Sequence, residues 1–409
     1  MSRPSVLFVT CHLPYPPLSG GRRRELELIR RVCDQFDVTL CAVSKTYSED
    51  LENAPALAEH CSHVWVFPAE PASDPRSPEP AQVTRHMSRA MTARVEAAVR
   101  DGRFDLLHVE GFYLMQHVPR RNPLPVLLVE QNVEYVLWRQ RAATALSKLE
   151  REGSINEYLR TLEAETAAWR QADLCAALTE DDAEIMRSAA PGVEVRLVPD
   201  GVDDLAAAAP PAASVATPPA VVFAANFAYQ PNVDAALYLC QEIWPRVERR
   251  VPDAALLIVG NDPPPEIRRL GSRRHVVVTG RVPAIEPFLD RASVVVCPLR
   301  VGGGIKVKML EAMSRGKAIV TTGVGAQGLR AFSGRAFRVE DHPSGFAHAV
   351  VSLLSDEASR RALEEGARDA AETLPTWDEA ASALTDCYGE LLRRQEGAGP
   401  LSGAAGRAR

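Results

Sequence analysis

The sequence lacks any apolar run long enough to cross a membrane: no stretch of about 18 apolar residues occurs in its 409 residues. We expect no secretory signal either, because the apolar run at residues 5–10 is short and a proline-rich turn follows. There is no basic excess, and a net charge of -6 argues against a dedicated nucleic-acid binder. The eight cysteines form no C-x-x-C pair, so we expect small core residues in a reducing compartment. These features predict a cytoplasmic protein.

Several motifs of catalytic chemistry are also missing. The sequence contains no D-x-D, no H-E-x-x-H and no cysteine–histidine cluster with ligand spacing, so we expect no metal and no other cofactor. It contains no G-x-S-x-G nucleophile elbow either. The adjacent acids at residues 180–182 are predicted to charge the start of a helix, with Thr179 as its N-cap.

The sequence does contain the pattern of an α/β protein. Its hydrophobic content is 46%, its charged content is 24%, and its length suggests two or three domains. Short apolar runs alternate with helical patterns, at residues 6–10, 38–43, 64–67, 106–109, 126–129 and 174–178, and again at 221–225, 255–259, 276–278, 294–297 and 319–321. We therefore expect the α/β class, with two doubly wound, Rossmann-like domains facing each other across a cleft.

Composition suggests where these domains begin and end. Residues 1–198 are expected to form an N-terminal domain and residues 199–375 a C-terminal domain. An Ala- and Pro-rich stretch at 206–220 predicts a surface linker. A helix is expected at 376–394, and the Gly-, Ala- and Arg-rich tail at 395–409 is expected to be disordered.

The most informative stretch, residues 294–325, predicts a buried strand, a glycine loop, a helix and a second buried strand. The loop and helix contain Gly302, Gly303, Gly304, Lys306, Lys308 and Glu311. Bare glycine backbone can approach an anion, helix N–H groups can cradle it, and the lysines suit a phosphate. The carboxylate suits a sugar or ribose hydroxyl. This pattern predicts half of a nucleotide-sugar site; the alternative is a flexible turn with a solvated glutamate.

The N-terminal domain offers a second set of candidates. Gly20 and Gly21 open its first helix, where backbone could approach a phosphate, although a plain strand–helix turn is the alternative. His108 and Glu110 end a strand on one shared face, and could do acid–base work or form a structural pair at a sheet edge. The next strand ends in polar residues that include Gln131, which indicates a site.

These motifs, in this order, resemble those of retaining glycosyltransferases of family GT4, which have the GT-B fold. The resemblance covers nearly the whole chain, from the loop at residues 13–21 to the helix of Trp377. Its strongest part is residues 298–329, with supporting segments at 198–203, 226–235, 257–260 and 279–283.

The resemblance implies a role for each candidate. The donor-binding set is Gly20, Gly21, Asn226, Arg281, Val282, Gly302, Gly303, Gly304, Ile305, Lys306 and Glu311, and the residues expected to act in catalysis are Lys308, His108 and Gln131. Within these sets, Glu311 would hold the ribose, the 302–305 loop would meet the diphosphate and sugar, and backbone near Arg281 would hold the base. Acceptor recognition would lie in the N-terminal domain, onto which the terminal helix would cross back.

Three positions depart from the family's pattern. The first glutamate of its E-x7-E pair would fall at Gly303, so only Glu311 is present. A histidine common at the end of an N-terminal strand is Gln131 here, and an asparagine of the V-P-N-G-V motif is Asp200. Loop backbone could substitute for the missing glutamate, and the glutamine keeps a hydrogen-bonding group that does not titrate.

The expected function is metal-independent transfer of a sugar from a nucleoside-diphosphate sugar to an acceptor hydroxyl, with retention at the anomeric carbon, in polysaccharide or glycoconjugate biosynthesis. The acceptor would be a small molecule, a glycan or a lipid-linked molecule. Basic helices at residues 22–31 and 85–103 could make peripheral membrane contact, whereas their interspersed acids favour a solvated face. Two alternatives are a nucleotide-sugar-binding subunit without turnover and an epimerase on the same fold.

Overall fold

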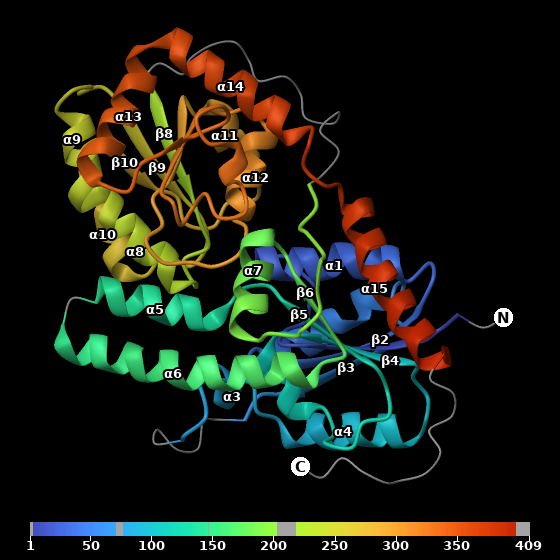
Figure 1. Cartoon of the computed structure of the whole chain (residues 1–409). Helices are drawn as coiled ribbons and strands as arrows, with labels where there is room; N and C mark the ends of the chain where they lie inside the picture. Colours follow the sequence, from blue (N-terminus) through green and yellow to red (C-terminus); the bar gives the residue numbers. More distant parts are fainter. Residues whose placement is uncertain (1–2, 71–76, 146, 203–217, 398–409) are drawn as a thin grey trace. The chain divides into compact units, whose positions relative to one another are not determined.

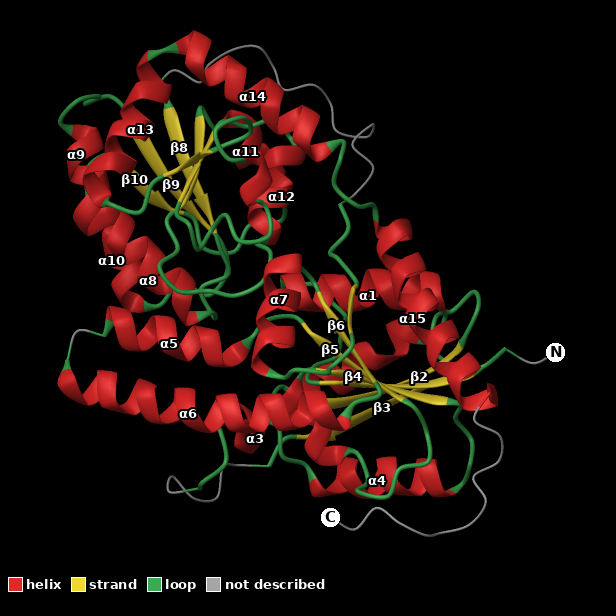
Figure 2. Cartoon of the chain, viewed as in Figure 1, coloured by secondary structure: helices red, strands yellow, loops and turns green. Residues whose placement is uncertain are grey.

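A computed structural model of the chain describes residues 3–70, 77–145, 147–202 and 218–397. The chain divides into two compact units (Figure 1). The first contains residues 1–135, residues 156–199 and the chain from Asp378 onward, and the second contains residues 136–155 and 200–377. Each unit has a parallel sheet with helices on both faces (Figure 2), so the predicted α/β class is confirmed.

The sheet of the first unit has seven strands in the order β3-β2-β1-β4-β5-β6-β7. They are β1 (Ser5–Thr10), β2 (Asp37–Ser44), β3 (His63–Pro68), β4 (Leu106–Glu110), β5 (Val126–Glu130), β6 (Leu174–Ala177) and β7 (Val195–Leu197). All neighbouring strands pair in parallel. The strand β5 is buried along its whole length, which explains why residues 126–129 are a continuous apolar run and not an alternating one.

The helices of the first unit are α1 (Gly20–Val32), α2 (Tyr47–Asn53), α3 (Ala81–Arg85), α4 (Arg89–Arg100), α7 (Glu180–Ala189), most of α6 (Lys148–Gln171) and α15 (Trp377–Gly397), with the short helices η1 (Ala54–Leu57) and η2 (Phe112–His117). Helix α7 begins as predicted, because the Thr179 hydroxyl accepts a hydrogen bond from the Asp182 N–H at 3.1 Å. Helix α15 packs into this unit through the fully buried Tyr388, whose ring meets Phe36 edge-on.

The sheet of the second unit has six strands in the order β10-β9-β8-β11-β12-β13. They are β8 (Ala220–Ala224), β9 (Ala255–Val259), β10 (Val276–Val278), β11 (Val294–Cys297), β12 (Ile319–Thr321) and β13 (Arg338–Val339). The predicted runs at 255–259, 276–278, 294–297 and 319–321 coincide with four of these strands. The two short strands β7 and β13, one in each unit, were not expected from their sequences.

The helices of the second unit are the larger part of α5 (Glu134–Thr144), α8 (Gln230–Tyr238), η4 (Leu239–Ile243), α9 (Trp244–Glu248), α10 (Pro265–Leu270), α11 (Glu286–Arg291), α12 (Val307–Ser314), α13 (Pro343–Ser355) and α14 (Glu357–Ala371), with the short turn η5 (Arg330–Phe332). Its core is closed by large side chains that are fully buried: Phe223, Trp244, Phe337 and Phe346. Burial of this kind stabilises the unit by about 2 kcal/mol or more per large side chain.

Within the residues that it describes, the structure differs from the expected boundaries at three places. Residues 136–155 cluster with the second unit, although they precede the expected boundary at 198. Residues 206–217 of the predicted linker lie outside the described residues, and Ala220 is already the first residue of β8. Gln395–Gly397 of the expected tail continue α15, and the rest of that tail lies outside the described residues.

None of the helices among the described residues is both long enough and apolar enough to span a membrane. The basic helix α1 has charges that are satisfied within the protein. Arg31 pairs with Glu27 at 2.7 Å and with Asp378, and Arg24 is buried. These pairs favour the solvated-face interpretation of α1.

Candidate functional site

The strand order locates the candidate sites in both units. In each sheet the chain runs outward from a central strand in one direction and then in the other, so the order reverses at β1 and β4 in the first unit and at β8 and β11 in the second. Crevices at the carboxyl ends of strands next to such a reversal are where doubly wound folds bind ligands. The predicted candidates follow these strands: Gly20 and Gly21 come after β1, Asn226 after β8, and the glycine loop after β11.

The glycine loop of the second unit is held together from inside by Lys306. The Lys306 Nζ donates hydrogen bonds to the carbonyl oxygens of Gly303 at 2.8 Å and Gly304 at 2.6 Å, and the lysine side chain is buried. Gly304 has φ +60°, a left-handed conformation that favours glycine. The Gly302 N–H donates to the Gln140 Oε1 of α5 at 2.8 Å. The ammonium thus satisfies two carbonyl oxygens of the loop by hydrogen bonding, which was not expected from the sequence.

Lys308 lies two residues further along, in the first turn of α12, and is half-buried. Its Nζ donates to the Asn232 Oδ1 at 2.7 Å and lies 4.9 Å from the centre of the Phe223 ring. Burial lowers the pKa of Lys308, and the charge of Glu311 on the same helix partly offsets this effect. A cation that is partly desolvated in this way gains more from an incoming anion than an exposed lysine does.

Asn232 connects two predicted residues that are far apart in sequence. Its side chain accepts from Lys308, and its Nδ2 donates to the carbonyl oxygen of Asn226 at 2.7 Å. The Asn226 Oδ1 in turn accepts from the Ala228 N–H at 3.0 Å, so it caps the turn that leads into α8. Asn226 and Lys308 therefore belong to one hydrogen-bonded group at the carboxyl end of β8.

A second glycine loop follows β12 and approaches β11 closely. A Cβ at Gly325 would lie 2.1 Å from the Thr321 Oγ1 and 3.0 Å from the Cys297 carbonyl oxygen. The Gly323 N–H donates to the Asp341 Oδ1 at 2.8 Å, which anchors the start of this loop. Only glycine fits at position 325.

A cavity of about 710 Å³ lies beside the loops after β9 and β10. Its lining includes Asp262, Pro263, Thr279, Gly280 and Arg281, and its floor is formed by β10. Arg281 lines this cavity, whereas Val282 packs partly buried against the core. The segment predicted to hold the base therefore borders a space of the size that suits a small ligand.

In the first unit, Gly20 and Gly21 are the first two residues of α1. Ser19 is the N-cap of this helix, and its hydroxyl accepts from the Arg22 N–H at 3.4 Å. A Cβ at Gly21 would lie 2.7 Å from the Gln131 Oε1 and 3.6 Å from the His12 ring. The glycine thus allows the helix start to lie against side chains from the ends of β5 and β1.

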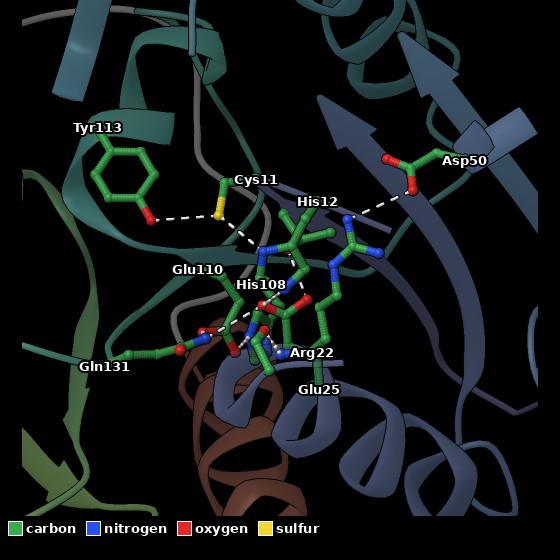
Figure 3. A network of polar contacts seen from close by, with 11 residues as sticks. Cys11, His12, Arg22, Glu25, Asp50, His108, Glu110, Tyr113 and Gln131 are labelled. Atoms are coloured by element: carbon green, nitrogen blue, oxygen red, sulfur yellow. Dashed lines mark hydrogen bonds and ion pairs between the residues drawn. The ribbon is translucent and has the colours of Figure 1, made fainter. Parts of the chain in front are cut away.

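Gln131 bridges two buried carboxylates (Figure 3). Its Nε2 donates to the Glu25 Oε1 and to the Glu110 Oε2, each at 3.1 Å. The predicted pair is confirmed as a contact, since the His108 Nε2 and the Glu110 Oε1 are 2.8 Å apart. Burial opposes ionisation of Glu110, but the hydrogen bond and charge of His108 outweigh it and lower its pKa.

The surroundings of His108 are those of a structural histidine. The side chain is fully buried, stacks on Phe8 with ring centroids 3.9 Å apart, and lies in the middle of the sheet, not at an edge. Because Glu110 accepts at Nε2, the Nδ1 is left to accept from the Tyr388 hydroxyl at 2.7 Å. Both ring nitrogens are engaged, which favours the structural interpretation; the catalytic role stays a prediction.

The sequence analysis missed a second histidine–carboxylate pair, at the end of β1. The His12 Nε2 lies 3.0 Å from the Glu25 Oε1, and its Nδ1 lies 3.2 Å from the Cys11 Sγ. The Tyr113 hydroxyl donates to the same sulfur at 3.4 Å (Figure 3). Burial raises the pKa of Glu25 to about 7, although His12 partly offsets the shift. The signal that could have found this pair is its position directly after a central strand.

Comparisons with known proteins agree with this architecture. Residues 218–356 match the family model described as "Glycosyl transferases group 1". No curated protein matches the chain. Sucrose-phosphate synthase from Thermosynechococcus elongatus is similar in structure, with a TM-score of 0.71 and 17% identity over 96% of this chain and 100% of that chain.

Two further solved structures are similar. HepE from Anabaena, in complex with UDP and glucose, has a TM-score of 0.63 and 13% identity, over 95% of this chain and 100% of that chain. WaaG, a glycosyltransferase involved in lipopolysaccharide biosynthesis, has a TM-score of 0.64 and 15% identity, over 94% of this chain and 100% of that chain. The predicted GT-B fold is confirmed, and the match to the family model lies within its second unit.

Proposed function

We propose that the chain is a retaining glycosyltransferase of the GT4 kind, which transfers a sugar from a nucleoside-diphosphate sugar to an acceptor hydroxyl without a metal ion. The observation that carries the proposal is the β11–loop–α12 segment, where bare backbone, two lysines and Glu311 follow a central strand inside the matched residues 218–356. A fold alone does not define an activity, so the proposal depends on the chemistry of this segment.

The donor's diphosphate is assigned to the second unit. Its charge would be balanced by Lys308 and by N–H groups at the start of α12, because a helix N-terminus and a partly desolvated cation both favour an anion. Glu311 would accept hydrogen bonds from the ribose hydroxyls. The base is assigned to the cavity that Arg281 lines. HepE, which was solved with UDP-glucose, makes uridine nucleotides the first to test.

Retention is proposed to follow from front-face attack. The loop assigned to the sugar, residues 302–305, carries three glycines and one isoleucine and so supplies no nucleophile. The leaving phosphate would then take the proton of the acceptor hydroxyl as the new glycosidic bond forms. Lys308 would stabilise the charge that develops on this phosphate.

The acceptor is assigned to the first unit. The region beyond the carboxyl ends of β1 and β5, called the acceptor crevice below, contains Gly21, Gln131 and His12, and the side chains of the last two are donors and acceptors suited to hydroxyl groups. A glycan, a small molecule or a lipid-linked acceptor would satisfy this chemistry. The paired charges of α1 favour an acceptor taken from solution, and co-flotation with anionic vesicles would favour a lipid-linked one.

The test is a thermal-shift panel of UDP-, GDP-, ADP- and dTDP-sugars, with and without chelator, on the wild type and on Glu311→Ala. A stabilisation by one donor that survives chelation and disappears in the variant supports the proposal. The anomeric configuration of the product, measured by NMR, decides retention. A shift that requires added metal, or an inverted product, contradicts the corresponding part.

One alternative comes from the departures at Gly303 and Gln131: a nucleotide-sugar-binding subunit that turns nothing over. It predicts the same thermal shift but neither transfer to an acceptor nor hydrolysis of the donor. Isothermal titration of the stabilising donor, followed by incubation and chromatography, separates the two. Intact donor after prolonged incubation with a panel of glycans and lipid-linked acceptors would favour the subunit.

A further inference from the structure

Cys11, the residue directly after β1, has surroundings that none of the mechanism above uses. Its sulfur lies 3.2 Å from the His12 Nδ1, and the opposite nitrogen of that ring lies 3.0 Å from the Glu25 carboxylate. Glu25 is fully buried and is fixed on its other oxygen by the Thr10 hydroxyl, which donates at 2.6 Å. Thiol, imidazole and carboxylate are thus in line, the order in which a thiol is activated as a nucleophile.

The other cysteines lack this arrangement. Six are buried, and for five of these burial raises the pKa of the thiol: Cys41, Cys61, Cys175, Cys240 and Cys387. Cys33 is half-exposed like Cys11, but its sulfur lies 3.9 Å from the His60 Nδ1, further than the 3.2 Å of the Cys11 contact. Its thiol donates to the Arg30 carbonyl oxygen at 3.1 Å, and burial and Asp34 raise its pKa. Cys33 is therefore a matched control within the same unit.

We propose that Cys11 is a nucleophilic thiolate and a site of covalent modification by small soft electrophiles, such as alkyl halides and peroxides. His12 holds the sulfur ionised by keeping its proton, and Glu25 orients the imidazole and stabilises its charge. The part of this proposal that concerns the acceptor crevice rests on the function proposed above; the chemistry of the sulfur does not.

The charges around Cys11 agree with this state. Burial opposes ionisation, yet the charge and hydrogen bond of His12 hold the pKa of Cys11 well below its usual value. Burial likewise disfavours the imidazolium, but Glu25 and the thiolate raise the pKa of His12 well above its usual value. From the neighbouring elements, the Tyr113 hydroxyl donates to the sulfur, His86 stacks on the Tyr113 ring, and the Lys45 charge also acts on the sulfur.

The reactions are simple displacements. With iodoacetamide, a sulfur lone pair forms the S–C bond and iodide leaves with its bonding electrons. With hydrogen peroxide, the sulfur attacks one oxygen, the O–O bond breaks, and the sulfur is oxidised to a sulfenic acid. The leaving hydroxide takes the His12 proton and departs as water, so the peroxide is reduced and no further reagent is needed.

Modification would also add bulk next to the acceptor crevice. His12, which contacts the sulfur, lies 3.6 Å from the position of a Cβ at Gly21, and that position is 2.7 Å from Gln131. A carbamidomethyl group on Cys11 therefore competes for this space. We expect the modified protein to bind donor normally in its second unit but to transfer sugar slowly.

The experiment is competitive labelling of the full-length protein with limiting iodoacetamide, read by peptide mass spectrometry. It is done near pH 8, above the value of about 7 to which burial raises the pKa of Glu25, so that this carboxylate is ionised. We expect Cys11 to react at least about tenfold faster than Cys33. This advantage should fall to about threefold or less in His12→Gln and in Glu25→Gln, while the Cys33 rate stays constant. Peroxide followed by dimedone should label Cys11 and leave Cys33 unlabelled.

Two outcomes overturn the proposal. One is a Cys11 rate equal to or below that of Cys33. The other is a Cys11 that is alkylated faster than Cys33 but at an unchanged rate in His12→Gln. This outcome overturns the proposal even if the buried Glu25→Gln variant does not fold. Unchanged transfer by fully alkylated protein overturns the crevice part alone. Failure of the function proposed above would give a different result: no donor would produce a thermal shift, while Cys11 would still be labelled faster than Cys33.

Discussion

The glycine loop after β11 supplies the sharpest test of the structure, through the substitution Lys306→Met. Methionine keeps an unbranched apolar stem and removes only the ammonium. In the wild type that ammonium donates to the carbonyl oxygens of Gly303 at 2.8 Å and Gly304 at 2.6 Å. If the lysine organises the loop, its loss should reduce stability even when no ligand is present.

The size of the effect follows from burial. Hydrogen bonds to a charged group contribute about 1.5–3 kcal/mol each, and a buried carbonyl left without its donor costs about 1–3 kcal/mol. Gly304 is buried, so its carbonyl loses the full amount, whereas water reaches the half-buried Gly303. Part of this loss is offset, because a buried ammonium is itself destabilising through its desolvation, and the substitution removes that unfavourable contribution. We expect a net loss of about 2 kcal/mol, or a roughly thirtyfold change in an equilibrium constant.

The measurement is urea unfolding followed by tryptophan fluorescence, since Trp244 is buried in the core of the second unit. With a urea dependence of about 2–3 kcal/mol per molar, the midpoint should fall by about 0.7–1 M. The matched control is Lys308→Met. This lysine is half-buried and makes a single side-chain hydrogen bond, to Asn232, so its loss should cost less than about 1 kcal/mol. A change within about 0.5 kcal/mol for Lys306→Met, together with a loss of donor affinity equal to that of Lys308→Met, would refute the reasoning, because it would mean that Lys306 faces the ligand.

Two further predictions concern stability alone. Burial raises the pKa of Glu130 well above its usual value. Between about pH 4.5 and the raised value, the folded state therefore holds a proton that the unfolded chain has lost, and the free energy of unfolding falls as the pH rises. Glu130→Gln keeps an oxygen for the Trp169 Nε1–H and cannot ionise. In urea unfolding, the free energy of unfolding of the variant relative to that of the wild type should therefore rise by about 1 kcal/mol or more between about pH 5 and pH 8. The same difference between variant and wild type at both pH values would contradict this. Gly325→Ala places a Cβ 2.1 Å from the Thr321 Oγ1 and should cost about 1–3 kcal/mol in the same assay. The control is Gly323→Ala, whose Cβ meets the Asp341 carboxylate at 3.3 Å and which should cost less. Equal urea midpoints for the two variants would refute the steric argument.

The fold was largely predictable because its strands are buried on both faces. Continuous apolar runs such as residues 126–129 and 294–297 have no other stable environment in a chain with this many short runs, and alternation with helical patterns required a parallel sheet. The strands β7 and β13 were missed because they contain three and two residues and Arg196 and Arg338 interrupt their apolar character. The assignment of residues 136–155 to the second unit depends on tertiary contacts that no local pattern reports.

The candidate site was predictable as far as residue types and strand ends go. Glycines, lysines and Glu311 after β11 indicate anion and hydroxyl chemistry wherever they occur after a strand. The direction of a side chain is a different matter: that Lys306 turns inward, while Lys308 binds Asn232 from α8, is decided by space and partners in three dimensions. The contacts proposed between the Gly20–Gly21 loop and a diphosphate stay a prediction.

Gln131 explains why two histidine–carboxylate pairs can coexist in one buried network. Its amide donates to Glu25 and to Glu110 without carrying a charge, so it satisfies both acids without changing their total charge. A histidine there would titrate between the two carboxylates, and its proton would compete with those of the pairs.

With the amide in place, the two histidines differ in exposure and not in partner type. Each has a carboxylate at Nε2 and a second partner at Nδ1, the Tyr388 hydroxyl for His108 and the Cys11 sulfur for His12. His108 is fully buried, whereas the His12 side chain is 20% exposed. Proton exchange with a ligand requires a group that the ligand can reach. We therefore expect acid–base chemistry in the first unit at His12 and the Cys11 sulfur beside it. The contacts of His108 favour a structural role, in which it holds Glu110 and, through Gln131, helps to hold Glu25.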